Sequence, residues 1–204
     1  MILLPFLAIL LYGALHSLMA AFGLKHRVRS LTGDRTYEGF YRLFYNSTSA
    51  LLLLPVVWVM LVTPATIVWQ IPAPWSGGLF ILQSAALLAL TLAVLQADPL
   101  RFAGVRQALA YFRHEPLPLP PEKLQIGGFY NLVRHPLYLF SLLLLWPTPV
   151  MTDTFLGFAI GATLYFVVGS RLEEKRLVAE FGHSYIAYQK SVPWLFPWPR
   201  PRTN

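Results

Sequence analysis

The sequence contains no cysteine, which excludes disulfide bonds, thiolate metal sites and cysteine nucleophiles. Charged residues make up only 12% of its 204 residues, whereas 56% are hydrophobic. A chain this apolar is not an ordinary soluble domain, and its length allows no more than one or two domains. It also lacks a glycine-rich loop of the Rossmann kind and any HExxH or Cys-rich ligand set. We therefore expect one integral-membrane domain over residues 1–204, with no Rossmann fold and no metal.

Five apolar runs follow one another along the chain. Residues 2–22, 43–62 and 78–97 form three runs of about 20 residues, the length that crosses a hydrocarbon core of roughly 30 Å. The last two runs, 137–151 and 155–169, are shorter and are separated by three residues only. The pattern predicts an all-α, polytopic membrane bundle of about five transmembrane helices, of which the last two form a short hairpin.

The distribution of Lys and Arg predicts the orientation of this bundle. All sixteen lie in segments 24–42, 98–136 and 170–204, while loop 63–77 and the hairpin tip at 152–154 hold none. The positive-inside rule places the three basic segments in the cytosol, so the N-terminus is expected outside and the C-terminus inside. Because the basic residues flank apolar runs, the net charge of +7 indicates membrane topology and no nucleic-acid partner.

The C-terminal tail carries an apolar stripe at helical spacing, formed by Leu177, Phe181, Tyr185 and Tyr188. This spacing predicts an amphipathic helix, which on the cytosolic side would lie on the lipid headgroups. We expect the chain to consist of a three-helix part, 1–97, followed by a second part, 98–204, which contains the hairpin and this tail.

An arginine and a histidine stand directly before the proline that opens the hairpin. Pro136 is suited to the first turn of a helix, because its missing N–H would have no partner there. Arg134 and His135 would then lie at a helix N-terminus, whose unpaired amides and positive dipole favour an anionic group. The alternative is that both residues are only the basic flank that membrane helices often carry.

Four further polar residues are expected at the cytosolic ends of the first three spans: His16, Asn46, Asp98 and Arg106. Polar groups at membrane depth usually face a bundle interior or a cavity. The alternatives are structural: His16 could make a hydrogen bond between helices. Asn46 and Asp98 could cap helices or pair with a neighbouring arginine.

Several of these residues belong to a pattern that resembles the C-terminal half of the integral-membrane methyltransferases, which include isoprenylcysteine carboxyl methyltransferase and the phospholipid N-methyltransferases. The pattern consists of Tyr130, Arg134-His135-Pro136-Leu137-Tyr138, Glu173-Glu174, Phe181-Gly182, Tyr185, Tyr188 and Val192-Pro193. Other segments more closely resemble the bacterial methanethiol S-methyltransferases and their relatives: His16-Ser17-Leu18-Met19-Ala20, Asp34-Arg35-Thr36-Tyr37 and Trp146-Pro147-Thr148-Pro149.

The resemblance implies that the protein binds S-adenosylmethionine (SAM) through residues 98–204. The cofactor-binding residues that it implies are Leu124, Gln125, Tyr130, Arg134, His135, Pro136, Leu137, Tyr138, Glu173 and Glu174. Gly169 falls near the position where the carboxyl methyltransferases place a substrate-contacting arginine, so Arg171 becomes the candidate substrate-binding residue, together with Asn46. The candidates for deprotonating the acceptor or holding its anion are His16, Asp98 and Arg106.

We therefore expect a SAM-dependent methyltransferase of the bacterial inner membrane that acts at the cytosolic face. Its partners would be the lipid bilayer and a small or lipophilic acceptor, most simply a thiol, which reacts as thiolate. One alternative is a carboxyl or lipid methyltransferase of the isoprenylcysteine type. The other is a non-catalytic membrane accessory protein of the denitrification-associated type.

Overall fold

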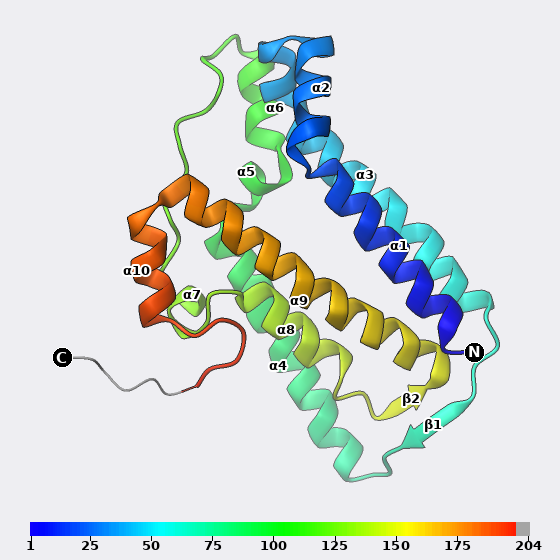
Figure 1. The fold of residues 1–204 in the computed structure, drawn as a ribbon. Helices are drawn as coiled ribbons and strands as arrows, with labels where there is room; N and C mark the ends of the chain where they lie inside the picture. The colour runs from blue at the N-terminus through cyan, green and yellow to red at the C-terminus, as the bar shows by residue number, and fades with distance from the viewer. Residues whose placement is uncertain (199–204) are drawn as a thin grey trace. The chain divides into compact units, whose positions relative to one another are not determined.

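The computed structural model describes residues 1–198. It is almost entirely helical, which confirms the predicted all-α membrane fold, and Figure 1 shows its elements in chain order. The helices are α1 (Leu3–Met19), α2 (Phe22–Thr32), α3 (Asp34–Val62), α4 (Trp75–Gln96), α5 (Pro99–Ala103), α6 (Val105–Phe112), α7 (Phe129–Leu132), α8 (Pro136–Leu145), α9 (Asp153–Phe181) and α10 (His183–Ser191). The strands are β1 (Ile67–Gln70) and β2 (Val150–Thr152). Two basic residues of the predicted cytosolic tail, Arg200 and Arg202, lie outside the described residues.

Within residues 1–198, three helices are long and apolar enough to cross a membrane, namely α3, α4 and α9. A fourth span results if α1 and α2 are counted together across the 53° bend between them. The two arms of the predicted hairpin are unequal, because α8 has 10 residues and α9 has 29. Helix α9 continues past the expected end at residue 169, since residues 170–181 contain neither glycine nor proline.

The chain forms two compact units, and each is described separately. The first unit comprises residues 1–66, 98–122 and 153–162. Its helix α3 packs against α1 and α6. Glycines permit close approaches in this unit: a Cβ on Gly161 would lie 2.4 Å from Ile9, and one on Gly104 would lie 2.3 Å from the backbone nitrogen of Leu43. Small residues are what allow membrane helices to pack this closely.

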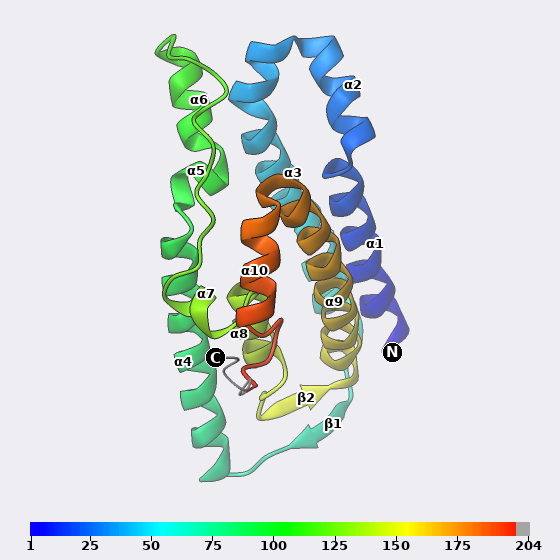
Figure 2. The same ribbon diagram turned by 60° about the vertical axis from the view of Figure 1, so that its left-hand side comes forward.

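The second unit comprises residues 67–97, 123–152 and the chain from 163 onward. Helices α4 and α8 run side by side in it. Strands β1 and β2, visible in Figure 2, pair antiparallel, with Ile67 opposite Thr152 and Gln70 opposite Val150. The pairing thus joins the loop between α3 and α4 to the tip of the predicted hairpin.

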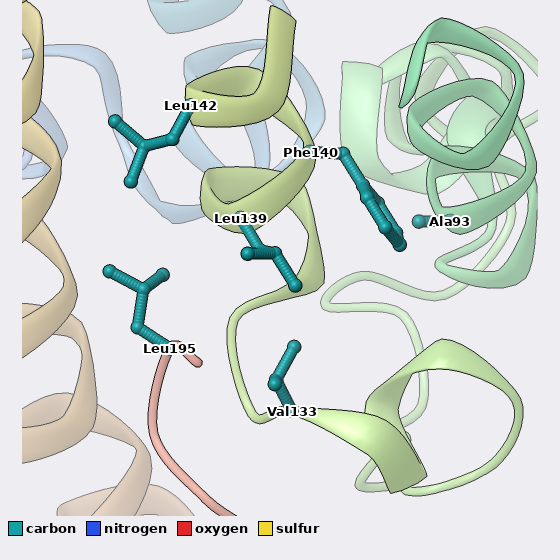
Figure 3. Packing of buried hydrophobic residues seen from close by; sticks show 6 residues of the cluster. All are labelled: Ala93, Val133, Leu139, Phe140, Leu142 and Leu195. Atoms are coloured by element: carbon teal, nitrogen blue, oxygen red, sulfur yellow. The ribbon is translucent and has the colours of Figure 1, made fainter. Parts of the chain in front are cut away.

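The core of the second unit brings α4, α8 and the C-terminal tail together. Figure 3 shows its buried side chains, Ala93, Val133, Leu139, Phe140, Leu142 and Leu195. A second cluster forms where α9 turns into α10 at Gly182, whose φ of 56° suits a residue without a Cβ. In this cluster the predicted stripe turns inward, because Leu177 and Phe181 pack against the buried Tyr185 and Tyr188.

Candidate functional site

The segment before α8 begins the helix as its sequence predicts. Pro136 is the first helical residue, and His135 is the N-cap, with φ −123° and ψ 63°. Both residues are buried. The backbone N–H groups of Arg134 and His135 donate to the carbonyl oxygens of Pro193 (2.9 Å) and Trp194 (3.2 Å). The C-terminal tail therefore fixes the start of this helix.

Arg134 forms a buried ion pair with Glu174 on α9. The distance between its Nε and Glu174 Oε1 is 2.6 Å, and only 7% and 10% of the two side chains are exposed. Its Nη1 donates to the carbonyls of Gln189 (2.8 Å) and Val192 (2.7 Å). Such a pair tolerates burial only because further hydrogen bonds satisfy its polar atoms. The guanidinium that the sequence assigned to a ligand is thus held by the protein itself.

His135 lies between the two consecutive glutamates. Its Nε2 is 3.4 Å from Glu174 Oε1, and its Nδ1 is 3.7 Å from Glu173 Oε2. Burial lowers the pKa of His135, although the nearby carboxylates act in the opposite direction. The imidazole is therefore neutral near pH 7.

Glu173 differs from its neighbour, because 46% of its side chain is exposed. Its Oε2 accepts a hydrogen bond of 2.9 Å from the hydroxyl of Tyr138. The ring of Tyr138 stacks between His135 and Phe166, at centroid distances of 5.5 and 5.3 Å. The arrangement offers an oriented, solvent-accessible carboxylate beside an aromatic surface, which suits a cationic group.

Tyr130 is connected to this cluster through α10. The hydroxyl of Tyr188 donates to its carbonyl oxygen. Burial, and to a lesser degree the charge of Glu173, raises the pKa of Tyr130 to about 12. Burial also raises the pKa of Tyr188 to about 12. Both phenols therefore stay protonated at physiological pH.

The other predicted cofactor residues of this unit have simpler surroundings. Leu124 packs against the Tyr185 and Tyr188 cluster, and Leu137 packs against the core of Figure 3. Gln125 is exposed. Arg171, the candidate for substrate binding, places its guanidinium carbon 3.8 Å from the centroid of the Trp194 ring, a close cation–π contact.

Two buried donors of the second unit were not among the predicted site residues. The Tyr185 hydroxyl and the Trp194 indole N–H find no hydrogen-bond partner among residues 1–198. Tyr185 stood out in the sequence only as part of an apolar stripe, and no motif named above includes Trp194. A stripe reports which face is buried but not whether the hydroxyl on it is satisfied.

In the first unit, His16 pairs with Tyr45. The hydroxyl of Tyr45 is 2.6 Å from His16 Nε2, and the centroids of the two rings are 4.8 Å apart. The contact links α1 to α3, which is the structural role weighed from the sequence. Helices α1 and α3 also form an apolar groove of about 410 Å³, whose lining includes Leu15, Pro55 and Tyr12. The ring centroid of Tyr12 is 5.8 Å from that of His16.

The other candidates of the first unit have partners within that unit. Asp98 caps α5 by accepting from the N–H of Arg101 (3.3 Å), and its Oδ1 lies 3.2 Å from Arg106 Nε. The amide of Asn46 donates to the carbonyls of Arg42 and Phe102, both at 2.9 Å. These contacts agree with the capping and pairing alternatives.

The candidate residues thus form two groups, each within one unit. Arg134, His135, Tyr138, Glu173 and Glu174 meet in the second unit, whereas His16, Asn46, Asp98 and Arg106 belong to the first. Within residues 1–198, no group of three or more His, Asp or Glu side chains could hold a metal ion.

Comparison with known proteins identifies the family. The model of the family described as NnrU protein matches residues 4–176. A methanethiol S-methyltransferase from a Pseudomonas species is 36% identical over 201 residues, which cover 96% of this chain and 73% of that protein. Methanethiol S-methyltransferase 2 from Bradyrhizobium diazoefficiens is 32% identical, covering 88% and 71%. The enzyme of this name from Mycobacterium tuberculosis is 30% identical, covering 91% and 78%.

No solved structure matches the chain. The relatives confirm the resemblance that the sequence motifs carry, since they align with most of the chain and not with the motifs alone. The chain therefore belongs to the NnrU proteins, a family of membrane methyltransferase-like proteins.

Proposed function

We propose that this protein transfers a methyl group from SAM to a thiol. The names of its relatives support the acceptor class, and the observation that carries the proposal is the carboxylate of Glu173. It is half exposed, held by Tyr138 and adjacent to stacked aromatic rings. SAM carries an ammonium and a sulfonium, which such a carboxylate and such rings attract.

The residues of the second unit fit this cofactor on structural grounds. Glu173 offers an accessible acceptor to an ammonium, and the unpartnered hydroxyl of Tyr185 is a buried donor without an acceptor among the described residues. Arg134 and Glu174 contribute by position, because their ion pair fixes His135 and the start of α8. Pro136, Leu137, Leu124 and Gln125 complete the proposed set.

When bound, SAM supplies a methyl carbon that is already activated by the sulfonium. The protein has to hold the cofactor, receive the proton of the thiol and exclude water. We propose His16 as the proton acceptor, because an imidazole can take up a proton and because its ring contacts Tyr12, which lines an apolar groove suited to a lipophilic or volatile thiol. We propose that four further residues position the acceptor or order the protein segments around it: Asp98, Arg106, Asn46 and Arg171.

We also propose a topology: the protein lies in the bacterial inner membrane, with its N-terminus outside and its C-terminus in the cytosol. The two loops without Lys or Arg carry β1 and β2, and the pairing of these strands supports their being on one side. The cysteine-free sequence permits a direct test. An impermeant thiol reagent should label Ala65→Cys from outside and Glu115→Cys only after the membrane is opened, and the reverse pattern would overturn the orientation.

The test of function combines binding with turnover on the purified protein in detergent. Calorimetry should detect binding of S-adenosylhomocysteine, and the protein should transfer the labelled methyl group of SAM to methanethiol. His16→Gln should lower kcat by about 100-fold without changing the affinity for S-adenosylhomocysteine, while the matched change His26→Gln, at an exposed histidine of α2, should alter neither.

Other outcomes assign the alternatives. Methylation of prenyl-cysteine or lipid in place of thiols would make the protein a carboxyl or lipid methyltransferase. A well-folded protein that binds neither SAM nor S-adenosylhomocysteine would be a non-catalytic accessory protein.

A further inference from the structure

The sequence assigned Arg134 to the anionic part of the ligand, but the structure uses this side chain elsewhere. Its Nε is paired with Glu174, and its Nη1 donates to two carbonyls of the tail. A carboxylate bound near this cluster would need other donors. SAM and S-adenosylhomocysteine both carry a carboxylate on their amino-acid part, so the question is which donors of the second unit remain.

Tyr185 is the best placed of them. Only 1% of this residue is exposed, yet its hydroxyl has no hydrogen-bond partner within the described part of the chain. Leaving a buried hydroxyl unpaired costs stability, and for that reason buried polar atoms are nearly always satisfied. Burial raises the pKa of Tyr185 above its ordinary value, so the group is a protonated donor.

Packing connects Tyr185 to the residues around His135, because Tyr185 packs in one cluster with Val192, whose carbonyl accepts from Arg134. Its ring lies 5.7 Å from that of Tyr188 on the same helix. Glu174, Arg134 and Glu173, which surround His135, act on the Tyr185 hydroxyl through their charges, as does Tyr188. The indole N–H of Trp194, whose carbonyl accepts from His135, is the second unpartnered donor in the unit among residues 1–198.

We propose that the hydroxyl of Tyr185 donates a hydrogen bond to the carboxylate of the bound S-adenosyl ligand. This inference rests on the proposed function. It assigns the two charged parts of the ligand to different residues: Glu173 takes the ammonium and Tyr185 takes the carboxylate. The hydroxyl is unpaired in the protein because its partner arrives with the ligand.

The test exploits two tyrosines that lie three residues apart on α10. In Tyr185→Phe, the ligand-free protein should melt about 2–4 °C higher, because an unpaired buried hydroxyl is removed. Its affinity for S-adenosylhomocysteine should fall roughly tenfold or more, the range for a hydrogen bond to a charged group. Tyr188→Phe should instead melt lower, because this hydroxyl is already bonded to the carbonyl of Tyr130.

A second ligand identifies the bonded group. 5′-Methylthioadenosine retains the adenosine and the thioether but lacks the amino-acid part, so Tyr185→Phe should not weaken its binding, measured by displacement of labelled S-adenosylhomocysteine. Equal losses for both ligands would overturn the assignment to the carboxylate. Unchanged affinity for S-adenosylhomocysteine, or a lower melting temperature of Tyr185→Phe, would overturn the proposal. Absence of all binding in the wild type would overturn the proposed function itself.

Discussion

The ion pairs formed by the candidate residues differ in burial between the two units, because the Asp98–Arg106 pair of the first is exposed and the Arg134–Glu174 pair of the second is buried. In the first unit, Asp98 accepts from a residue three positions later, and Asn46 donates to two carbonyls that lie 4 and 56 positions away. In the second unit, Arg134 reaches Glu174 and Val192, which are 40 and 58 positions away. A helix brings together hydrogen-bond partners that lie three or four positions apart. Partners tens of positions apart meet only once the whole unit has folded.

Both units leave buried polar atoms without a partner among residues 1–198: Gln107 Oε1 in the first, and the Tyr185 hydroxyl and Trp194 indole N–H in the second. The second unit adds Glu173, whose carboxylate is half exposed. A buried polar network that joins residues far apart in the sequence, and that leaves some polar groups without a partner, is unusual in a hydrophobic core. Such departures are expected at functional sites. On this comparison we place the proposed ligand chemistry in the second unit, at the buried ion pair and the accessible Glu173.

The largest effect should come from breaking the buried pair. Glu174→Ala leaves the Arg134 guanidinium buried without its carboxylate and should lower the free energy of unfolding by about 3–5 kcal/mol. The measurement is chemical unfolding in detergent. The double variant Arg134→Met with Glu174→Leu should recover much of the loss, because no charge is then left unpaired. A single variant as stable as the wild type would show that the pair does not hold the unit together.

The next effect separates two neighbouring carboxylates. Glu173→Gln keeps a hydrogen-bond acceptor for Tyr138 but removes the charge, so the affinity for S-adenosylhomocysteine should fall about tenfold or more. Because Glu173 is half exposed, unfolding should change by less than about 1 kcal/mol. Glu174→Gln is the matched control and should show a clear loss of stability. If both variants lose stability equally and neither loses affinity, Glu173 is structural.

Local signals made part of this arrangement predictable. The start of α8 at Pro136 follows from the ring of proline, and the helical membrane fold follows from apolar runs of sufficient length. The sequence showed one apolar stripe, formed by Leu177, Phe181, Tyr185 and Tyr188. It did not show that these side chains pack against one another where α9 turns into α10. Which surface covers a stripe depends on the break at Gly182 and on packing beyond it.

Long-range pairing set the limit of prediction. Nothing near Arg134 in the sequence indicates that Glu174 neutralises it, since both residues equally suit a zwitterionic ligand. The strands β1 and β2 have four and three residues, too few for a period-two pattern, and they are strands only because they pair. Partners separated by tens of residues cannot be read from spacing without the fold.

Acidification should destabilise the second unit through His135. Burial holds its pKa below the ordinary value of about 6.5, so the unfolded state binds a proton before the folded state does. The stability that depends on neutral His135 is fully present above about pH 6.5, and it falls as the pH drops toward the pKa of His135 in the folded state. Glu173, Glu174 and Arg134 face the ring, and the carboxylates moderate the loss. Melting temperatures between pH 7.5 and 5.5 should decline less in His135→Gln; an equal decline would assign the effect to other groups.

The smallest effect should be at Asp98 in the first unit. Asp98 adopts a left-handed φ of 51° and caps α5, while its ion pair with Arg106 is exposed. Asparagine caps as well as aspartate and tolerates this conformation, so Asp98→Asn loses only the ion pair, worth less than about 1 kcal/mol. Asp98→Ala also loses the cap and should cost about 1 kcal/mol more. If Asp98 only orders the segment around α5, the asparagine variant still folds, and its kcat should stay within a factor of about three of the wild-type value. A loss near 100-fold, the size expected for a general base, would make Asp98 the proton acceptor in place of His16, and the exposed ion pair of the first unit would then take part in the chemistry.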